Sequence, residues 1–307
     1  MTIIVKTKGR GTGIILILIG SMLWGISGTV AQYLFQKSGF SPEWLVDIRL
    51  LISGIILLIY AFIKSNRAVL EVWKSKYDCL NILMFGILGM LSVQYTYFAA
   101  IKYGNAATAT ILQYLSPVII TIYISIKTRK RPSIQEIWGI ILAMLGTFLI
   151  ITKGNVSSIS ISKLALFWGI SSAFAAAFYT VQPKYLLNKF GSTITVAWGM
   201  LIGGIAFSFI HKPWDFIGEW SIESVLAVIF VVLFGTLIAF YCYLESLKYV
   251  KPTEASVLSS AEPLSAAFLS VIWLNVPLGI SQWIGTLCII VTIIILSFIN
   301  KSNGEQN

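Results

Sequence analysis

Two ionisable residues stand inside long apolar stretches of the sequence, where an unpaired charge is costly. Glu262 lies within the apolar stretch 252–273 and directly precedes Pro263, and Arg49 precedes another apolar run. In lipid each such charge costs about 2.5–3.5 kcal/mol on insertion scales, so it needs a reason. Pro263 has no N–H to donate and frees a carbonyl one turn earlier, near Ser259. Glu262 is therefore predicted to bind a proton or a solute, with a protonated glutamate bonded to a neighbouring helix as the structural alternative.

Arg49 is the second candidate for binding. The apolar run 50–63 that follows it has 14 residues, and at about 1.5 Å per residue a helix of that length is too short to span a bilayer. The helix must therefore draw Arg49 and Asp47 into the outer part of the membrane. We expect Arg49 either to bind a solute carboxylate or to snorkel outward, and Asp47 to sit at the outer surface.

Uncharged polar and aromatic side chains in the apolar stretches are further candidates. Gln94 and Tyr97, like Gln113 and Pro117, recur at three- or four-residue spacing, so each pair lies on one helix face. Such groups on apolar walls suit a neutral or zwitterionic solute with an apolar part, and helix-packing hydrogen bonds are the alternative for each of them. The substrate-binding candidates are Glu262, Arg49, Trp24, Gln32, Gln94, Tyr97, Gln113, Tyr179, Tyr241, Tyr243 and Ser259, and the candidate helix breaks at the membrane midplane are Pro117 and Pro263.

The sequence predicts no catalytic, metal, cofactor or nucleic-acid site. Cys79, Cys242 and Cys288 are widely separated, and His211 is the single histidine. Metal sites need clustered ligands, and enzymes need a nucleophile with a base or clustered acids, so neither chemistry is indicated. The net charge of +10 comes from basic residues between apolar segments, which is an orientation signal and not a patch for nucleic acid.

Helices of a membrane protein are needed to position these residues. Of 307 residues, 57% are hydrophobic and 11% are charged, and the mean hydropathy is +0.86. A soluble domain carries about 25% charged residues, so this chain must turn apolar surface to lipid. Apolar windows of about 20 residues predict an all-α integral membrane protein with ten transmembrane helices. These lie at roughly 13–34, 43–63, 79–101, 105–126, 134–152, 163–184, 193–210, 222–246, 252–273 and 279–299.

The charges between these spans predict the orientation. One set of alternating loops and ends holds sixteen Lys and Arg residues, and the other set holds five. Basic residues concentrate on the cytoplasmic side, so we expect a multi-pass protein of a bacterial inner membrane with both termini in the cytoplasm. The basic N-terminus before 13–34 is similar to a signal peptide, but the apolar stretch is too long for one and is interpreted as a retained first helix.

The chain matches itself at a fixed offset of 146 residues. The matched pairs include Gly89/Gly235, Tyr95/Tyr241, Tyr97/Tyr243, Lys102/Lys248, Pro117/Pro263 and Gly139/Gly285. The repeating unit holds five helices, an odd number, so the second copy enters the membrane from the opposite side. We expect a first five-helix repeat at 1–152 and a second, inverted repeat at 153–307, together one membrane domain with a binding site between them near the midplane. A duplicated scaffold without a site is the alternative.

Four short motifs carry a family resemblance. They are Trp24-Gly25, Arg49 followed by Leu-Leu-Ile-Ser-Gly, Ala-Ile-Lys-Tyr-Gly-Asn-Ala at 100–106, and Glu262-Pro263 with Gln282-Trp283-Ile284-Gly285. In this order and spacing they resemble the drug/metabolite transporter superfamily, EamA type, over nearly the whole chain. The resemblance implies a ten-helix carrier of small metabolites, often an exporter. Family members carry a glutamate after helix four and after helix nine, where this chain has Lys127-Thr-Arg-Lys-Arg and Asn275-Val-Pro-Leu, so no coupling role carries over.

The predicted function is therefore secondary transport of a small organic metabolite, an amino acid or a similar amphiphilic solute, in the direction of export. The expected mechanism is alternating access at a central cavity between the two repeats. The expected partners are this solute and the lipid bilayer, with proton coupling open and with either a monomer or a homodimer as the assembly. The competing hypotheses are an integral-membrane enzyme acting on a lipid or prenyl substrate, and a channel.

Overall fold

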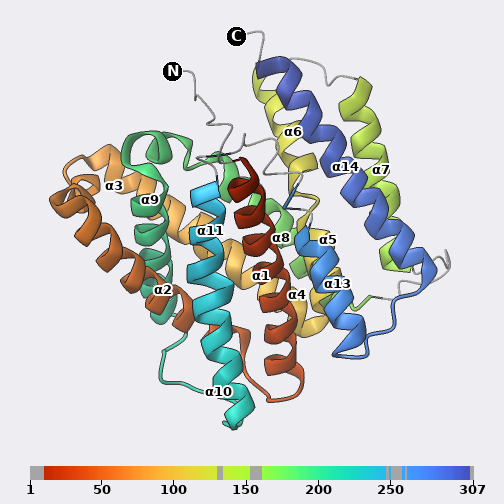
Figure 1. Ribbon diagram of the computed structural model, residues 1–307, viewed down its shortest axis with the longest axis horizontal. Coiled ribbons are helices and arrows are strands. Elements are labelled where there is room, and N and C mark those ends of the chain that lie inside the picture. Colours follow the sequence, from red (N-terminus) through yellow and green to blue (C-terminus); the bar gives the residue numbers. More distant parts are fainter. Residues whose placement is uncertain are drawn as a thin grey trace.

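The structure, a computed structural model, is a bundle of helices (Figure 1). It describes residues 10–129, 134–152, 161–246, 249, 258–259 and 261–304, and all secondary structure in these residues is helical. The elements are α1 (Arg10–Gln36), α2 (Pro42–Ser65), η2 (Asn66–Trp73), α3 (Lys76–Met84), η3 (Phe85–Leu91), α4 (Ser92–Tyr103), α5 (Ala106–Gln113), α6 (Ser116–Thr128), α7 (Ile134–Thr152), α8 (Lys163–Val181), α9 (Lys184–Ser208), α10 (Ile222–Ile229), η4 (Phe230–Ile238), α11 (Ala239–Ser246), α13 (Ala261–Ile272) and α14 (Ile280–Gly304).

Local sequence explains where several helices begin. The Ser41 hydroxyl accepts a hydrogen bond from the backbone N–H of Trp44 at 3.1 Å, and Pro42 is the first residue of α2. Asn105 caps α5 and Ser162 caps α8 in the same way, by accepting from a backbone N–H three residues later. Each cap satisfies a donor that the first turn of a helix leaves unpaired.

Four irregular points interrupt the long helices. Two are π-helical segments, η3 between α3 and α4 and η4 between α10 and α11. The third is at residues 114–115, where the predicted span 105–126 divides into α5 and α6 directly before Pro117. The fourth is Gly191 within α9, whose φ of 78° breaks the helix. The predicted span 193–210 begins just after this glycine, because the hydropathy signal found only the segment beyond the break.

Small residues let the helices approach closely. α2 packs along α9, α4 along α8, α7 along α14, and α1 along both α11 and α13. A Cβ added at Gly203 would lie 2.8 Å from the Gly86 carbonyl oxygen, and one at Gly199 would lie 2.6 Å from the Phe85 ring. The Gly199–Gly203 motif of α9 is thus a packing surface for η3, as such spacing is in membrane helices.

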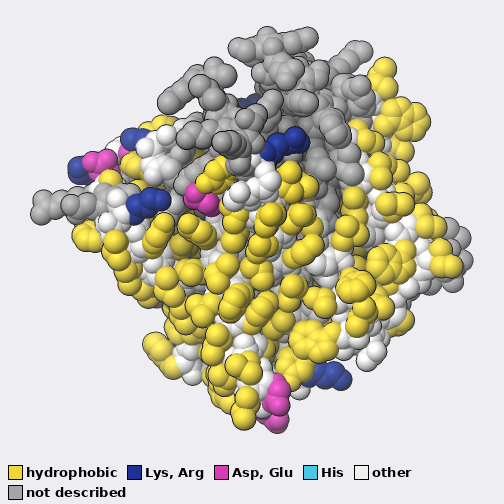
Figure 2. Space-filling view, in the orientation of Figure 1, with side chains coloured by type: hydrophobic (Ala, Val, Ile, Leu, Met, Phe, Trp, Pro, Cys, Tyr) yellow, Lys and Arg dark blue, Asp and Glu magenta, His cyan; other side chains and the backbone are white. Residues whose placement is uncertain are grey.

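The outer face of the bundle is apolar. Figure 2 shows hydrophobic side chains over the middle of the visible face, with charged side chains toward its upper and lower margins. Among the described residues, seven helices are long and apolar enough to cross a membrane. They are Arg10–Gln36, Pro42–Lys64, Lys76–Tyr103, Ala106–Lys127, Lys163–Val181, Lys184–Ser208 and Ile222–Tyr243, and the shorter apolar helices are Ile137–Leu149, Ala261–Ile272 and Ile280–Thr292. This is a multi-pass membrane protein, since lipid is the solvent that suits such a face.

Candidate functional site

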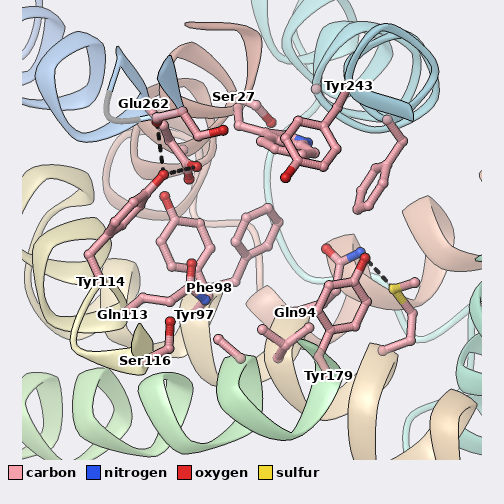
Figure 3. A pocket seen from close by; sticks show the side chains of 18 of the residues that line it. Ser27, Gln94, Tyr97, Phe98, Gln113, Tyr114, Ser116, Tyr179, Tyr243 and Glu262 are labelled. Atoms are coloured by element: carbon pink, nitrogen blue, oxygen red, sulfur yellow. Dashed lines mark hydrogen bonds between the residues drawn. The ribbon is translucent and has the colours of Figure 1, made fainter. Parts of the chain in front are cut away.

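A cavity of about 310 Å³ lies in the interior of the bundle. Helices from both halves of the sequence contribute to its wall. It is lined by Trp24, Ser27, Gly28, Arg49, Met90, Val93, Gln94, Tyr97, Phe98, Gln113, Tyr114, Ser116, Ala176, Tyr179, Thr180, Gly235, Phe240, Tyr243, Ser259 and Glu262. Figure 3 shows side chains converging on this space, among them Tyr97, Tyr114, Tyr179 and Tyr243. The wall is therefore aromatic with a few polar groups, which is the usual composition of a small-molecule site.

Glu262 and Tyr114 form the acidic part of the cavity. The Tyr114 hydroxyl lies 2.9 Å from a carboxylate oxygen of Glu262 and 2.9 Å from the carbonyl oxygen of Ser259 (Figure 3). Ser259 is the residue four positions before Pro263, so its carbonyl is the one that the proline cannot engage. Tyr114 occupies the break between α5 and α6. The break between α5 and α6 and the backbone before Pro263 thus come together at the carboxylate of Glu262.

Arg49 forms the basic part of the cavity. The side chain is buried, its Nε donates to the Thr236 hydroxyl at 3.0 Å, and its guanidinium carbon lies 4.6 Å from the ring centroid of Phe98. Thr236 belongs to η4 and donates in turn to the carbonyl of Val231. Arg49 therefore does not snorkel to the surface: it links α2 to the π segment and is held by a cation–π contact in the interior.

Asp47 corrects one expectation from the sequence. It was expected at the outer surface, yet it is fully buried, and both its carboxylate oxygens accept from the Ser208 hydroxyl, at 3.1 and 3.2 Å. The prediction was wrong because it considered only the helix that carries Asp47. The packing of α9 on α2 covers that face and brings Ser208 to it.

Aromatic side chains complete the wall of the cavity. The Tyr97 hydroxyl shares a hydrogen bond of 2.7 Å with Thr110, and Tyr179 stacks on Phe85 at 5.5 Å between centroids. Trp24 packs against both Phe240 and Tyr243, at 5.1 and 5.3 Å. These contacts hold the rings in fixed positions around the space.

Two polar groups on the wall keep bonding capacity for a solute. Ser27 is buried, and its hydroxyl has no hydrogen-bond partner among the described residues. Within the part of the chain that the structure describes, the Gln94 amide makes one long contact, 3.8 Å to the sulfur of Met90. Both side chains line the cavity.

Most of the candidates chosen from the sequence lie together on this wall. Those that line the cavity are Glu262, Arg49, Trp24, Gln94, Tyr97, Gln113, Tyr179, Tyr243 and Ser259. Gln32 and Tyr241 lie outside it. Gln32 accepts from the backbone N–H of Ala106 at 2.8 Å and so caps α5, while Tyr241 is 46% exposed and meets the ring of Tyr60.

Sequence reasoning missed Tyr114 and Phe240. Tyr114 was passed over because Gln113 and Pro117 were assigned to one face of a continuous helix, and Tyr114 falls beside that face. The break at 114–115 turns it toward Glu262. A proline disrupts the helical turn that precedes it, and Tyr114 stands three residues before Pro117, so the signal was present in the sequence.

The fold and the cavity define a multi-pass membrane protein with a cavity of small-molecule size between its helices. The EamA-like transporter family matches residues 11–152 and, a second time, residues 163–298. The chain belongs to this family of membrane transporters.

Individual relatives agree with the family. The chain is 41% identical to the uncharacterized inner membrane transporter YicL of Salmonella typhimurium, over 95% of this chain and 97% of the relative. It is 25% identical to the uncharacterized transporter YwfM of Bacillus subtilis, over 92% of each. A solved crystal structure with 16% identity covers 95% of this chain and 99% of its own, with a TM-score of 0.64, which shows likeness of fold. The protein is thus a multi-pass inner membrane transporter.

Proposed function

We propose that this transporter exports a small amphiphilic metabolite, an amino acid or a similar zwitterionic solute, by alternating access at the central cavity. The observation that carries the proposal is that Glu262 and Arg49 line one cavity whose other walls are aromatic. The solute carboxylate binds the guanidinium of Arg49, its ammonium group binds the carboxylate of Glu262, and its apolar part packs on the rings. A bidentate guanidinium is well suited to a carboxylate.

The size of the cavity supports one small solute at a time. Its volume of about 310 Å³ falls at the lower end of the range for small-molecule sites, which is about 300–1,000 Å³. Ser27 and Gln94 supply neutral hydrogen-bonding groups on the same wall. Proton binding by Glu262 is the alternative use of its carboxylate, and it would couple transport to the proton gradient.

We further propose ten spans arranged as two inverted five-helix repeats, at 1–152 and 153–307. The seven long apolar helices and the three shorter ones correspond one to one to the predicted spans. The π segments support the repeat, because Gly89 of η3 and Gly235 of η4 stand 146 residues apart, the offset found in the sequence. The two successive matches to the family support it as well.

The helix packing supports the same symmetry. When the halves are exchanged, the contact of α4 with α8 becomes that of α11 with α1, and the contact of α6 with α8 becomes that of α13 with α1. The contact of η3 with α9 likewise becomes that of η4 with α2. All six contacts are present. With five spans in each unit, two such units have opposite directions in the membrane, and the charge distribution favours cytoplasmic termini.

Counterflow in proteoliposomes tests the proposal. Vesicles containing the purified protein and an unlabelled amino acid are diluted into the same labelled amino acid, and a panel beginning with apolar amino acids is compared. We expect saturable accumulation of label, and at least about a tenfold loss with Glu262→Gln, since a hydrogen bond to a charged group contributes about 1.5–3 kcal/mol. Glu71→Gln, an exposed acid outside the cavity, is the control.

Two results would overturn parts of this proposal. A folded Glu262→Gln protein that carries solute at the wild-type rate removes Glu262 from the site. Absence of counterflow for every amino acid removes the solute class. Export is tested separately, because cells that lack an exporter accumulate its solute, and unchanged or lower intracellular levels would refute that direction.

A further inference from the structure

A second, smaller crevice lies outside the central cavity, between α2, α9 and α11. Its volume is about 110 Å³. Each helix contributes polar groups to it. The residues that matter here are Tyr60 and Lys64 of α2, Ser192 and Thr193 of α9, and Tyr241 and Glu245 of α11.

This crevice lies where a membrane helix leaves the lipid. Lys64 is the last residue of the apolar span Pro42–Lys64, and its neighbour Ile63 is 80% exposed on the outer face. The rings of Tyr60 and Tyr241 are both partly exposed and meet edge to face at 6.3 Å. Tyrosine at the end of an apolar span is typical of the interface between lipid and water. The crevice therefore faces the headgroup level of the bilayer.

One side of the crevice suits an anion. Gly191 breaks α9 with a φ of 78°, although a Cβ there would meet nothing within 4 Å, so close packing does not explain the glycine. The break starts a new helical segment at Ser192 and Thr193, and the first N–H groups of a helix lack internal acceptors and carry partial positive charge. Lys64 adds a full positive charge, with its ammonium 5.7 Å from the ring centroid of Tyr60.

The other side of the crevice suits a cation, because Glu245 lines it from α11. A lysine and a glutamate on one crevice at the headgroup level match a ligand that carries a phosphate next to an ammonium group. We propose that the crevice binds the headgroup of a zwitterionic phospholipid with a primary amine. The phosphate binds Lys64 and the Ser192–Thr193 turn, the ammonium binds Glu245, and the acyl chains lie along the exposed apolar face of α2.

Such a lipid would touch the wall of the central cavity. Phe240 lines both the crevice and the cavity, so this residue lies between the two spaces. On the cavity side the same ring packs edge to face on Trp24. A headgroup in the crevice would therefore support this partition from its outer side.

Lipid retention measured by native mass spectrometry tests the proposal without any transport assay. The full-length protein in detergent is mixed with phosphatidylethanolamine, phosphatidylcholine or phosphatidylglycerol of identical acyl chains. We expect phosphatidylethanolamine to be retained about tenfold better than either of the others, because the choline methyl groups block hydrogen bonding and the glycerol headgroup has no ammonium. Equal retention of all three lipids, or preference for another one, overturns the assignment.

Variants and a soluble headgroup complete the experiment. Lys64→Gln is expected to weaken the retention of both phosphatidylethanolamine and phosphatidylglycerol. Glu245→Gln is expected to remove the preference for phosphatidylethanolamine over phosphatidylglycerol. Lys74→Gln and Glu71→Gln, an exposed pair 3.4 Å apart outside the crevice, make the same charge changes and should alter nothing. Retention unchanged in the crevice variants refutes the site. Glycerophosphoethanolamine carries the same headgroup without acyl chains. If it bound as well as phosphatidylethanolamine, the crevice would be a site for a soluble solute, and the proposal of a lipid would be refuted.

Discussion

Arg49 is a buried cation that uses part of its bonding capacity on the described residues around it. Nε bonds Thr236 and the guanidinium faces the ring of Phe98, while the side chain also lines the cavity. Arginine keeps its charge in such surroundings and presents five donors in a planar fork. Because the bond to Thr236 fixes one edge of the guanidinium, its other N–H donors can face the cavity.

Arg49→Lys tests whether this planar orientation matters. Lysine keeps the positive charge but loses the Nε donor to Thr236 and the flat contact with Phe98. We expect the KM for counterflow to rise about tenfold or more, since the bond lost involves a charged group. Arg129→Lys, at the exposed end of α6, makes the same exchange away from the cavity and should leave KM unchanged. An unchanged KM in Arg49→Lys would show that the arginine serves packing alone.

Tyr114→Phe tests the hydroxyl that joins Glu262 to the carbonyl of Ser259. The change keeps the ring but removes the donor from two acceptors in the interior. We expect a loss of about 1–3 kcal/mol in stability, seen as a lower melting temperature in detergent, together with slower transport. Tyr123→Phe on the lipid-facing side of α6 is the matched control. Equal melting temperatures in the two variants would contradict the role assigned to this hydroxyl.

At the scale of single residues, the sequence identified the ionisable residues of the cavity better than it predicted which way other polar side chains point. Glu262 and Arg49 were found because an ionisable group in an apolar stretch is costly wherever it points. Gln32 and Tyr241 do not line the cavity, and Asp47 is buried where exposure was expected, because the face that a polar residue presents depends on which helix packs against it. Gln32 turned out to cap α5, a partner 74 positions away.

At the scale of elements, seven predicted spans coincide with described helices long enough to cross a membrane, and the other three coincide with shorter apolar helices. The interruptions of the helices were only partly foreseen. A hydropathy window averages about 20 residues and cannot resolve a change of one residue per turn, which is what a π segment is. The prolines did indicate the break at 114–115 and the carbonyl of Ser259 that accepts from Tyr114. The π segments carry no such marker in the sequence beyond Gly89 and Gly235.

Gly89 and Gly235 differ in the side chains that surround them. This difference gives a test of how closely α1 packs against η4. A Cβ at Gly235 would overlap the side chain of Ser27, whereas one at Gly89 would lie 3.2 Å from the edge of the Phe85 ring. We expect Gly235→Ala to destabilise the protein by roughly 1–3 kcal/mol, as overpacking does, and Gly89→Ala to cost less than about 1 kcal/mol.

Thermal melting in detergent distinguishes the two glycine variants. Adding Ser27→Gly to Gly235→Ala removes the overlapping group and should restore most of the lost stability, because the two sites are in contact and their effects are not additive. If Gly89→Ala and Gly235→Ala melted alike, the close approach of α1 to η4 would not explain the glycine.

For the whole molecule, alternating access requires that one end of the cavity be closed while the other is open. The connections before α2 and before α10 lie at the same end of the bundle (Figure 1) and are joined by aromatic contacts and hydrogen bonds. Phe40 meets the rings of Phe216 and Trp220 at 4.9 and 5.1 Å, and Trp44 Nε1 donates to the carbonyl of Pro213 at 2.8 Å. This aromatic closure joins the two halves of the chain and must separate if that end opens.

A disulfide across this closure tests the separation. The backbone N–H of Glu219 donates to the carbonyl of Ser38 at 2.9 Å, so the two backbones are in direct contact, and a disulfide needs Cα atoms about 4.4–6.8 Å apart. Ser38→Cys with Glu219→Cys, in a chain whose Cys79, Cys242 and Cys288 are replaced by serine, should therefore cross-link on oxidation. We expect the oxidised protein to lose counterflow and to regain it on reduction, while each single variant stays active throughout. Full transport by the cross-linked protein would mean that the solute passes without parting these loops, and a carrier that rocks between two halves could not do that.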